Sequence, residues 1–433
     1  MASGSPGTKW SAMEDSLKKL PALTSRLKRW IVSARAADTL VLLAAIGLAI
    51  AVRVSVLDFK SLDFYASLKP WYNMIKAEGF AAFATGFSTY NPPYLYLLYL
   101  VARFLPNTPV VVAVKLPSLV ADFVCAYLAF LIVARLEPQR PALPTLAALA
   151  VLFAPSVGLN SAFWGQADSL FTAGLLACVY FLQLRQHGLA MLSFGLAVAF
   201  KLQAVFMAPV VLALLLRKEL PWRSVAIVPL VLFAAIVPAW VVGRPLSELL
   251  GVYLYQTSQF ESITMNAPTV YAWLPDTKRV FNELYVPAVF MGAAASVAWL
   301  TLLYKAHSRI RDRILLEVSL VSMLIVPLFL PKMHERYFFP ADVLSIVFAF
   351  VCPRFFYVPI LVVGASFLSY QPFLFERQYV PLPYLALVLI ATTAILSYHS
   401  LKQLYGGVSI GEARDAGGPP AMSSQSAPEG DPE

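Results

Sequence analysis

Charged residues are scarce in this sequence. Only 13% of its 433 residues are Asp, Glu, Lys or Arg, whereas 59% are hydrophobic, and soluble domains carry roughly 25% charged residues. This shortage excludes an ordinary soluble fold, because too few charged side chains are present to cover its surface. The long apolar runs instead predict an integral membrane protein made of helices, since each helix satisfies its own backbone hydrogen bonds in lipid.

Cysteine, histidine and the familiar catalytic motifs are also scarce or absent. The three cysteines lie inside apolar runs at spacings that match no disulfide or zinc pattern, which favours a packing role. No HExxH, Walker A, GxSxG or dinucleotide-binding glycine motif occurs, so metalloprotease, NTPase and hydrolase functions lack support. The net charge of +9 resides in short loops and the N-terminal segment, which indicates membrane orientation and no nucleic-acid partner.

The composition divides the chain into three parts. Residues 1–37 are polar and basic, residues 38–404 hold the apolar runs, and residues 405–433 are rich in Gly, Pro, Ser and acidic residues. We expect the first part to lie in the cytoplasm without a cleavable signal peptide, and the last part to be disordered. The middle part predicts an all-α, polytopic bundle of about twelve spans with both termini cytoplasmic.

One apolar run, residues 94–105, is too short to be a span. It has 12 residues between a Pro-Pro pair and Pro106, whereas the hydrocarbon layer is roughly 30 Å thick. We therefore predict a juxtamembrane or re-entrant helix on the outer side, which also keeps the basic loops inside. Four polar segments then share the outer face: residues 58–109, 158–168, 243–283 and 331–340.

The first polar segment carries the candidate catalytic base. It contains Asp58 and Asp63, and transfer of a sugar to a hydroxyl group needs a carboxylate that takes or orients the acceptor proton. Solvation of a loop is the simpler interpretation of an isolated aspartate. Aromatic neighbours favour the sugar interpretation, although aromatic residues also line membrane interfaces without any ligand. The candidate substrate-binding rings here are Trp71, Tyr72 and Tyr90.

Later polar residues offer contacts for a phosphate or a sugar. Asp168 is a candidate for a metal ion or a sugar hydroxyl, or else it caps the helix that follows it. Lys201 either extends to the membrane interface or binds a lipid phosphate. Lys332, His334 and Arg336 are candidates for binding phosphate or diphosphate, or else they form an interfacial charge cluster.

An ordered series of motifs resembles a known family. It begins with Asp63 and PWY at 70–72, continues through YNPPYLY at 90–96, WGQ at 164–166, KLQ at 201–203 and NAP at 266–268, and ends with MHERYFFP at 333–340. Over residues 38–400, the series resembles bacterial membrane proteins related to the second mannosyltransferase of GPI-anchor synthesis, in the GT-C superfamily. The other candidate substrate-binding residues lie in or beside these motifs: Asn91, Asn160, Trp164, Gln166, Asp168, Gln203, Asn266, Glu335 and Tyr337.

The resemblance implies a GT-C bundle whose first outer loop carries the catalytic aspartate in juxtamembrane helices. It implies an inverting transfer of a hexose, with mannose expected, from a polyprenyl-phosphate donor to a lipid, glycan or protein acceptor at the outer face of the cell membrane. It favours Asp63 over Asp58 as the base, and it places Lys201, His334 and Arg336 against the carrier phosphate. A divalent metal ion, Mg or Mn, at Asp63 and Asp168 stays open.

Two functions from other classes fit the same sequence. A multi-pass transporter or flippase for a lipid-linked sugar would use the same cavity and basic residues, but it would need no essential acid. A non-catalytic subunit of a membrane glycosylation complex would keep the fold without turnover, and the presence of Asp63 argues against it. The function predicted from the sequence is therefore that of a polyprenyl-phosphate-sugar-dependent hexosyltransferase.

Overall fold

The computed structural model describes residues 36–406. These residues are helical almost throughout, so the all-α expectation is confirmed apart from two parallel two-residue strands, β1 (Thr264–Met265) and β2 (Met333–His334). The predicted cytoplasmic segment up to residue 35 and the predicted disordered tail from residue 407 lie outside the described residues.

Within the described residues, five helical segments are long and apolar enough to cross a membrane alone. A sixth is obtained if two helices joined at a 49° bend count as one span. A multi-pass membrane protein is therefore confirmed, whereas twelve separate spans are not shown. The five segments are α6 (Val110–Leu136), α12 with α13 (Trp222–Val225 and Ile227–Val241), α15 (Lys278–Lys305), the segment 353–375 with α18 (Tyr357–Phe375), and α19 (Leu382–Tyr405).

Proline explains why other apolar runs form shorter helices. It occupies the first or second position of several of them, where its missing N–H breaks no helical hydrogen bond. Proline also disfavours helix in the residue before it, and at Ala154, before Pro155, the backbone is extended and α7 ends. The helices that begin in this way are α7 (Leu143–Phe153), α8 (Pro155–Gly158), α11 (Ala208–Leu216) and α17 (Phe339–Val351).

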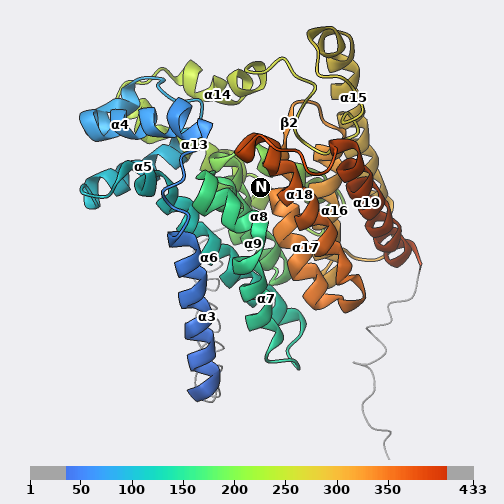
Figure 1. Ribbon diagram of the computed structural model, residues 1–433. Helices are drawn as coiled ribbons and strands as arrows, with labels where there is room; N and C mark the ends of the chain where they lie inside the picture. Colours follow the sequence, from blue (N-terminus) through green and yellow to red (C-terminus); the bar gives the residue numbers. More distant parts are fainter. Residues whose placement is uncertain (1–35, 407–433) are drawn as a thin grey trace, which may run out of the picture.

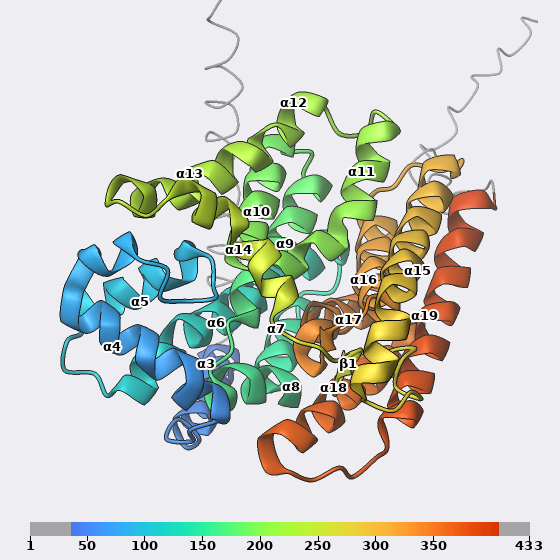
Figure 2. The ribbon, with the colours of Figure 1, turned by 90° about the horizontal axis from the view of Figure 1, so that it is seen from above.

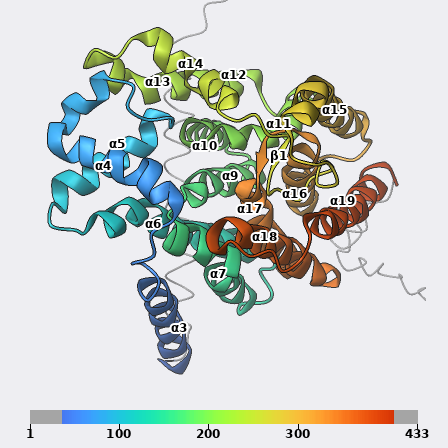
Figure 3. The ribbon, with the colours of Figure 1, turned by 45° about the horizontal axis from the view of Figure 1, so that its top comes forward.

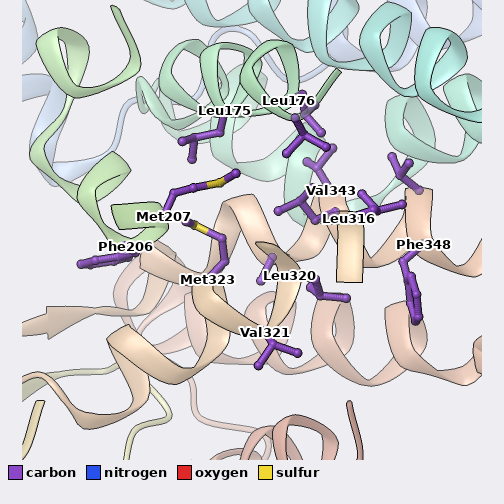
Figure 4. Close-up of a cluster of buried hydrophobic side chains, with 14 of the residues drawn as sticks. Leu175, Leu176, Phe206, Met207, Leu316, Leu320, Val321, Met323, Val343 and Phe348 are labelled. Atoms are coloured by element: carbon purple, nitrogen blue, oxygen red, sulfur yellow. The ribbon is translucent and has the colours of Figure 1, made fainter. Parts of the chain in front are cut away.

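The main apolar core lies between helices from both halves of the chain. Figure 4 shows leucines of α9 (Asp168–Gln183) facing side chains of α16 (Asp312–Phe329) and α17, with Phe206 and Met207 beside them. Within a membrane such helices associate through close packing of their side chains, since lipid tails are as apolar as leucine. In Figure 2, α9 and α10 (His187–Phe200) lie in the middle of the bundle. The helix α3 (Ala36–Val54) lies on one side of them, and α15, α16 and α19 lie on the other.

Short elements gather at one end of the bundle. Figure 1 shows α4 (Lys69–Glu78), α14 (Leu246–Ser258) and β2 at this end, and Figure 3, in which this end is turned forward, shows α5 (Pro92–Phe104) beside α4. The helix α5 is 13 residues long and packs against α4, as the prediction of a non-spanning helix requires. The second predicted outer loop, residues 158–168, is not a loop. It contains a buried π-helical segment, η3 (Leu159–Trp164), because its polar side chains turn inward to partners inside the bundle.

Candidate active site

A cavity of about 460 Å³ opens at the end of the bundle formed by these short elements. All four predicted outer segments contribute side chains to its wall. Ten of the residues proposed from the sequence line it together: Asp63, Trp71, Tyr90, Gln166, Lys201, Gln203, Lys332, His334, Arg336 and Tyr337.

Asp63 presents one fixed and one open carboxylate oxygen. Trp164 Nε1 donates to Asp63 Oδ2 at 2.8 Å, and Gln166 Nε2 donates to the same oxygen at 2.6 Å. The other oxygen, Oδ1, has no hydrogen-bond partner among the described residues. Two donors therefore orient the carboxylate while one oxygen can accept a proton from a group in the cavity.

Gly165 separates these two donors in the chain. Its φ of 86° lies in the left-handed region, and a Cβ built there would approach Lys115 Cγ to 3.2 Å. Any larger residue would be both strained and crowded at this position. The glycine ends η3 and thereby lets Trp164 and Gln166 reach the same oxygen of Asp63.

Tyr90 fixes the orientation of the Gln166 amide. Its hydroxyl donates to Gln166 Oε1 at 3.4 Å, which leaves the amide nitrogen facing Asp63. Burial raises the pKa of Tyr90, so the hydroxyl stays protonated and able to donate. The Tyr90 ring lies 5.1 Å from that of Trp71, and together the two rings give the cavity an aromatic wall suited to a sugar.

Asp168 is a buried counterion beneath the cavity. It is fully buried, pairs with Lys201, and accepts a hydrogen bond from Asn160 Nδ2 at 2.8 Å. Arg336 Nε lies 4.0 Å from its Oδ2. Lys201, which is only 8% exposed, therefore does not extend to the membrane interface. Asp168 is also the first residue of α9, which follows an N-cap at Ala167, so it does not cap that helix.

His334 and Arg336 form the cationic side of the cavity. Arg336 Nη1 lies 3.4 Å from His334 Nδ1. Because a guanidinium can only donate, Nδ1 is the acceptor and the ring proton lies on Nε2. Burial, together with the nearby Arg336 and Lys201, holds the pKa of His334 well below its usual value. A neutral imidazole with an N–H on Nε2 is left to donate to an anion.

Glu335 is buried beside this cationic side. Its Oε1 accepts from Arg336 Nη1 at 3.3 Å. Burial raises the pKa of Glu335 to about 7, although the adjacent Arg336 opposes the shift. The same guanidinium stacks over the Trp164 ring, with Cζ 5.2 Å from its centroid, so Trp164 contacts both the Asp63 carboxylate and the Arg336 cation.

The β1–β2 pair sets the position of His334. Met265 is the register partner of His334, and Lys332 N donates to Ile263 O at 2.9 Å. The ammonium group of Lys332 lies 4.6 Å from the Tyr285 ring centroid. The third predicted outer segment is therefore not a loosely held loop at this point, since it holds the cationic strand from one side.

Several proposed residues lie outside the cavity wall. Asp58 is exposed, and the adjacent carbonyl groups accept hydrogen bonds from Lys115, whereas Asp63 lines the cavity. Tyr72 is fully buried, and Asn91 donates to Ala199 O at 2.8 Å. Asn160, Trp164, Asp168 and Glu335 are also buried and do not line the cavity, and Asn266 forms a bridge with His334.

The described residues contain no group of three or more His, Cys, Asp or Glu side chains suited to a metal ion. Lys201 and Asn160 also occupy the two oxygens of Asp168. The donor set at Asp63 and Asp168 therefore does not fit the divalent ion that the sequence left open.

Sequence reasoning missed a buried network on Asp122. Arg53 Nε donates to Asp122 Oδ2 at 3.0 Å, and Ser161 and Ser169 donate to its two oxygens at 2.5 Å each. The two serines flank the segment that carries Trp164 to Asp168, so the network anchors both ends of it. The available signal was a pair of opposite charges inside two predicted spans, which lipid makes costly unless they pair.

Known proteins resemble this chain in sequence and in fold. The model of glycosyltransferase family 87 matches residues 89–331, more than half of the 433-residue chain. No protein of curated function matches the sequence.

The fold is similar to two solved structures of ArnT from Cupriavidus metallidurans. The structure bound to undecaprenyl phosphate gives a TM-score of 0.52 at 13% identity, over 85% of this chain and 77% of that chain. The apo structure gives 0.52 at 14% identity, over 84% and 77%. At such low identity, this likeness shows a shared fold alone.

Proposed function

The chain belongs to glycosyltransferase family 87, and from that membership we propose which transfer this membrane glycosyltransferase performs. The donor is a hexose, with mannose expected, linked to a polyprenyl phosphate. The acceptor is a hydroxyl or amide group of a lipid, a glycan or a protein. Transfer takes place at the outer face of the cell membrane and inverts the anomeric configuration.

The single observation that carries the proposal is the open oxygen of Asp63 in a cavity that also holds a cationic side. Trp164 joins the two, because its indole N–H donates to Asp63 while its ring lies against the Arg336 guanidinium. A base and a group that binds a leaving phosphate are the two requirements of an inverting transfer from a phosphate-linked sugar.

These positions support the following reaction. Asp63 Oδ1 accepts the proton of the acceptor group as its oxygen or nitrogen attacks C1 from the face opposite the phosphate. The new bond to C1 forms, the bond between C1 and the phosphate oxygen breaks, and the electron pair stays on that oxygen. Asp63 ends protonated, and the lipid phosphate leaves with one additional negative charge.

Three groups stabilise that charge. Arg336 and Lys201 lie at the cavity and share Asp168 as a counterion, and His334 offers its Nε2 proton as a donor. When Glu335 is protonated it no longer competes for Arg336, whose guanidinium then binds the phosphate more strongly. The undecaprenyl phosphate bound to ArnT, which shares the fold, supports a polyprenyl carrier here.

The distribution of charge supports the proposed orientation. Arg185, Lys218, Arg309 and Arg311 lie at the end of the bundle away from Asp63, where α9 and α11 end and α16 begins. Basic loops favour the cytoplasmic side of a membrane, so the cavity with Asp63 faces outward.

A panel of labelled polyprenyl-phosphate hexoses, given to purified protein in lipid nanodiscs, tests the function. We expect release or transfer of the sugar from at least one donor, with the β-linked carrier yielding an α-linked product or the reverse. Binding of donors without turnover, across the panel and with cell-envelope lipids supplied as acceptors, would instead indicate a transporter or a non-catalytic subunit.

A further inference from the structure

A second cavity, here termed the basic cavity, lies at the other end of the helices that form the candidate active site. Its volume is about 880 Å³, and it lies where α9, α11 and α15 end and where α10 and α16 begin. The helix α9 runs from Asp168 to the basic cavity over 16 residues, a length of roughly 24 Å. The two cavities are therefore separate sites.

Positive charge dominates the wall of the basic cavity. The acidic residues on this wall are both paired, Asp312 with Arg135 at 3.0 Å and Glu219 with Arg217 at 2.8 Å. The other cations of the wall form no ion pair within the described part of the chain: Arg185, Lys218, Lys305, Arg309 and Arg311. Cations that surround one cavity repel each other unless an anion lies between them.

A fixed backbone framework holds part of this charge. Arg217 Nη1 donates to Ala306 O at 2.6 Å, and its Nη2 donates to Ser308 O at 2.7 Å. Glu219 Oε2 accepts from the backbone N–H of Ile310 at 3.1 Å. Arg309 and Arg311 flank Ile310, so the segment that carries them is fastened to the end of α11 and is not a free loop.

Two further cations occupy backbone positions that favour glycine. Arg185 follows the end of α9 with a φ of 57°, and Lys218 follows the end of α11 with a φ of 58°. Left-handed backbone costs a residue with a side chain roughly 1–2 kcal/mol, and glycine is the usual residue there. Keeping Arg and Lys at both positions places two cations at the cavity despite that strain.

Two helices also begin at the basic cavity without a side-chain cap. These helices are α10 and α16, and the side chains of their N-cap residues, Gln186 and Arg311, form no hydrogen bond with the first N–H groups of these helices. The first N–H groups of a helix carry partial positive charge and favour anions. In addition, His187 Nδ1 is buried in this wall without a hydrogen-bond partner among the described residues.

We propose that the basic cavity binds an anion that carries a phosphate group. The arginine forks match phosphate oxygens, and uncapped helix N-termini bind the same group. Basic loops alone are enough to orient a protein in a membrane. That role would not require the cations to surround one cavity, on a segment that hydrogen bonds hold in place. The phosphate belongs to a lipid headgroup or to a soluble compound, and the proposal does not depend on the proposed transferase reaction.

The test uses the full chain in phosphatidylcholine nanodiscs and two probes. One probe is inorganic pyrophosphate in solution, and the other is phosphatidic acid included in the nanodisc. The test variant is Arg309→Gln with Arg311→Gln. The matched control, Arg140→Gln with Arg354→Gln, removes two exposed cations that do not line the cavity. A second control, His334→Asn, changes the active-site cavity only.

We expect one probe to raise the melting temperature of the wild type and of both controls. The Arg309 and Arg311 variant should bind that probe at least about tenfold more weakly, since two charge-assisted contacts are lost. A response to pyrophosphate identifies a soluble ligand, and a response to phosphatidic acid alone identifies a headgroup. No response to either probe overturns the proposal, as does an equal response in the test variant or a response lost in His334→Asn.

Discussion

Replacing Asp168 by asparagine should destabilise the protein more than any exposed substitution near the cavity. The change keeps the shape of the side chain and its contact with Asn160, but it removes one full negative charge. Asp168 is fully buried, and it pairs with Lys201 and lies 4.0 Å from Arg336. Both cations are then left in a buried site with less compensation.

The size of the effect follows from the burial of the three groups. Removing one partner of a buried ion pair costs about 3–5 kcal/mol of unfolding free energy, because the remaining charge is uncompensated. Lys201→Met should cost less than Asp168→Asn, since Arg336 still lies beside Asp168. In the double variant, Asp168→Asn with Lys201→Met, only Arg336 loses Asp168 as a counterion. The double variant should therefore lose less unfolding free energy than the sum of the two single variants, by about 1 kcal/mol or more.

Unfolding in mixed detergent micelles, followed by tryptophan fluorescence, measures these free energies. The matched control is Asp58→Asn, which changes an exposed aspartate that does not line the cavity and should be nearly neutral. Additive single effects, or an Asp168→Asn variant as stable as the control, would contradict the reasoning, because they would mean that Asp168 does not compensate these cations.

Three further predictions follow from the site and the packing. Since the pKa of Glu335 is about 7, its ionisation above that pH should draw Arg336 away from the phosphate and raise the donor KM, and Glu335→Gln should flatten this alkaline rise in a KM profile from pH 6 to 8.5. Gln166→Met removes the 2.6 Å hydrogen bond to Asp63, so kcat should fall by about 10- to 100-fold with little change in donor KM, as steady-state kinetics would report. Gly174→Ala places a Cβ within 2.8 Å of an atom on α10 and should lower the unfolding free energy by about 1–3 kcal/mol in the same micelle assay.

The convergence of polar segments on one end of the bundle was predictable from the sequence. Each segment lies at the end of an apolar run, and the basic loops fix which ends share a face. Asp63, Gln166 and His334 meet at one cavity for that reason. The order of the motifs favoured Asp63 over Asp58 as the base. Of these two aspartates, only Asp63 lines the cavity.

The number of spans and the buried ion pairs were harder to predict from the sequence. Hydropathy treats an apolar run as one unit, whereas prolines such as Pro155 and Pro209 begin new helices within such runs. The pairing of Arg53 with Asp122 joins residues 69 positions apart, and no local pattern reveals such a contact. The sequence likewise leaves an interfacial position open for Lys201, because its partner Asp168 lies 33 residues away in the chain.

The assignment of Asp63 as the base is tested most directly by the turnover of a polyprenyl-phosphate hexose by Asp63→Asn. The same assay is run on Asp58→Asn, and donor binding is measured for both variants. The account predicts that Asp63→Asn keeps donor binding and loses about 100-fold or more of kcat, in line with the roughly 10²–10⁴-fold that a general base contributes. It predicts that Asp58→Asn stays near wild-type activity. Turnover that survives in Asp63→Asn, or that is lost in Asp58→Asn instead, would contradict the assignment of Asp63 as the base.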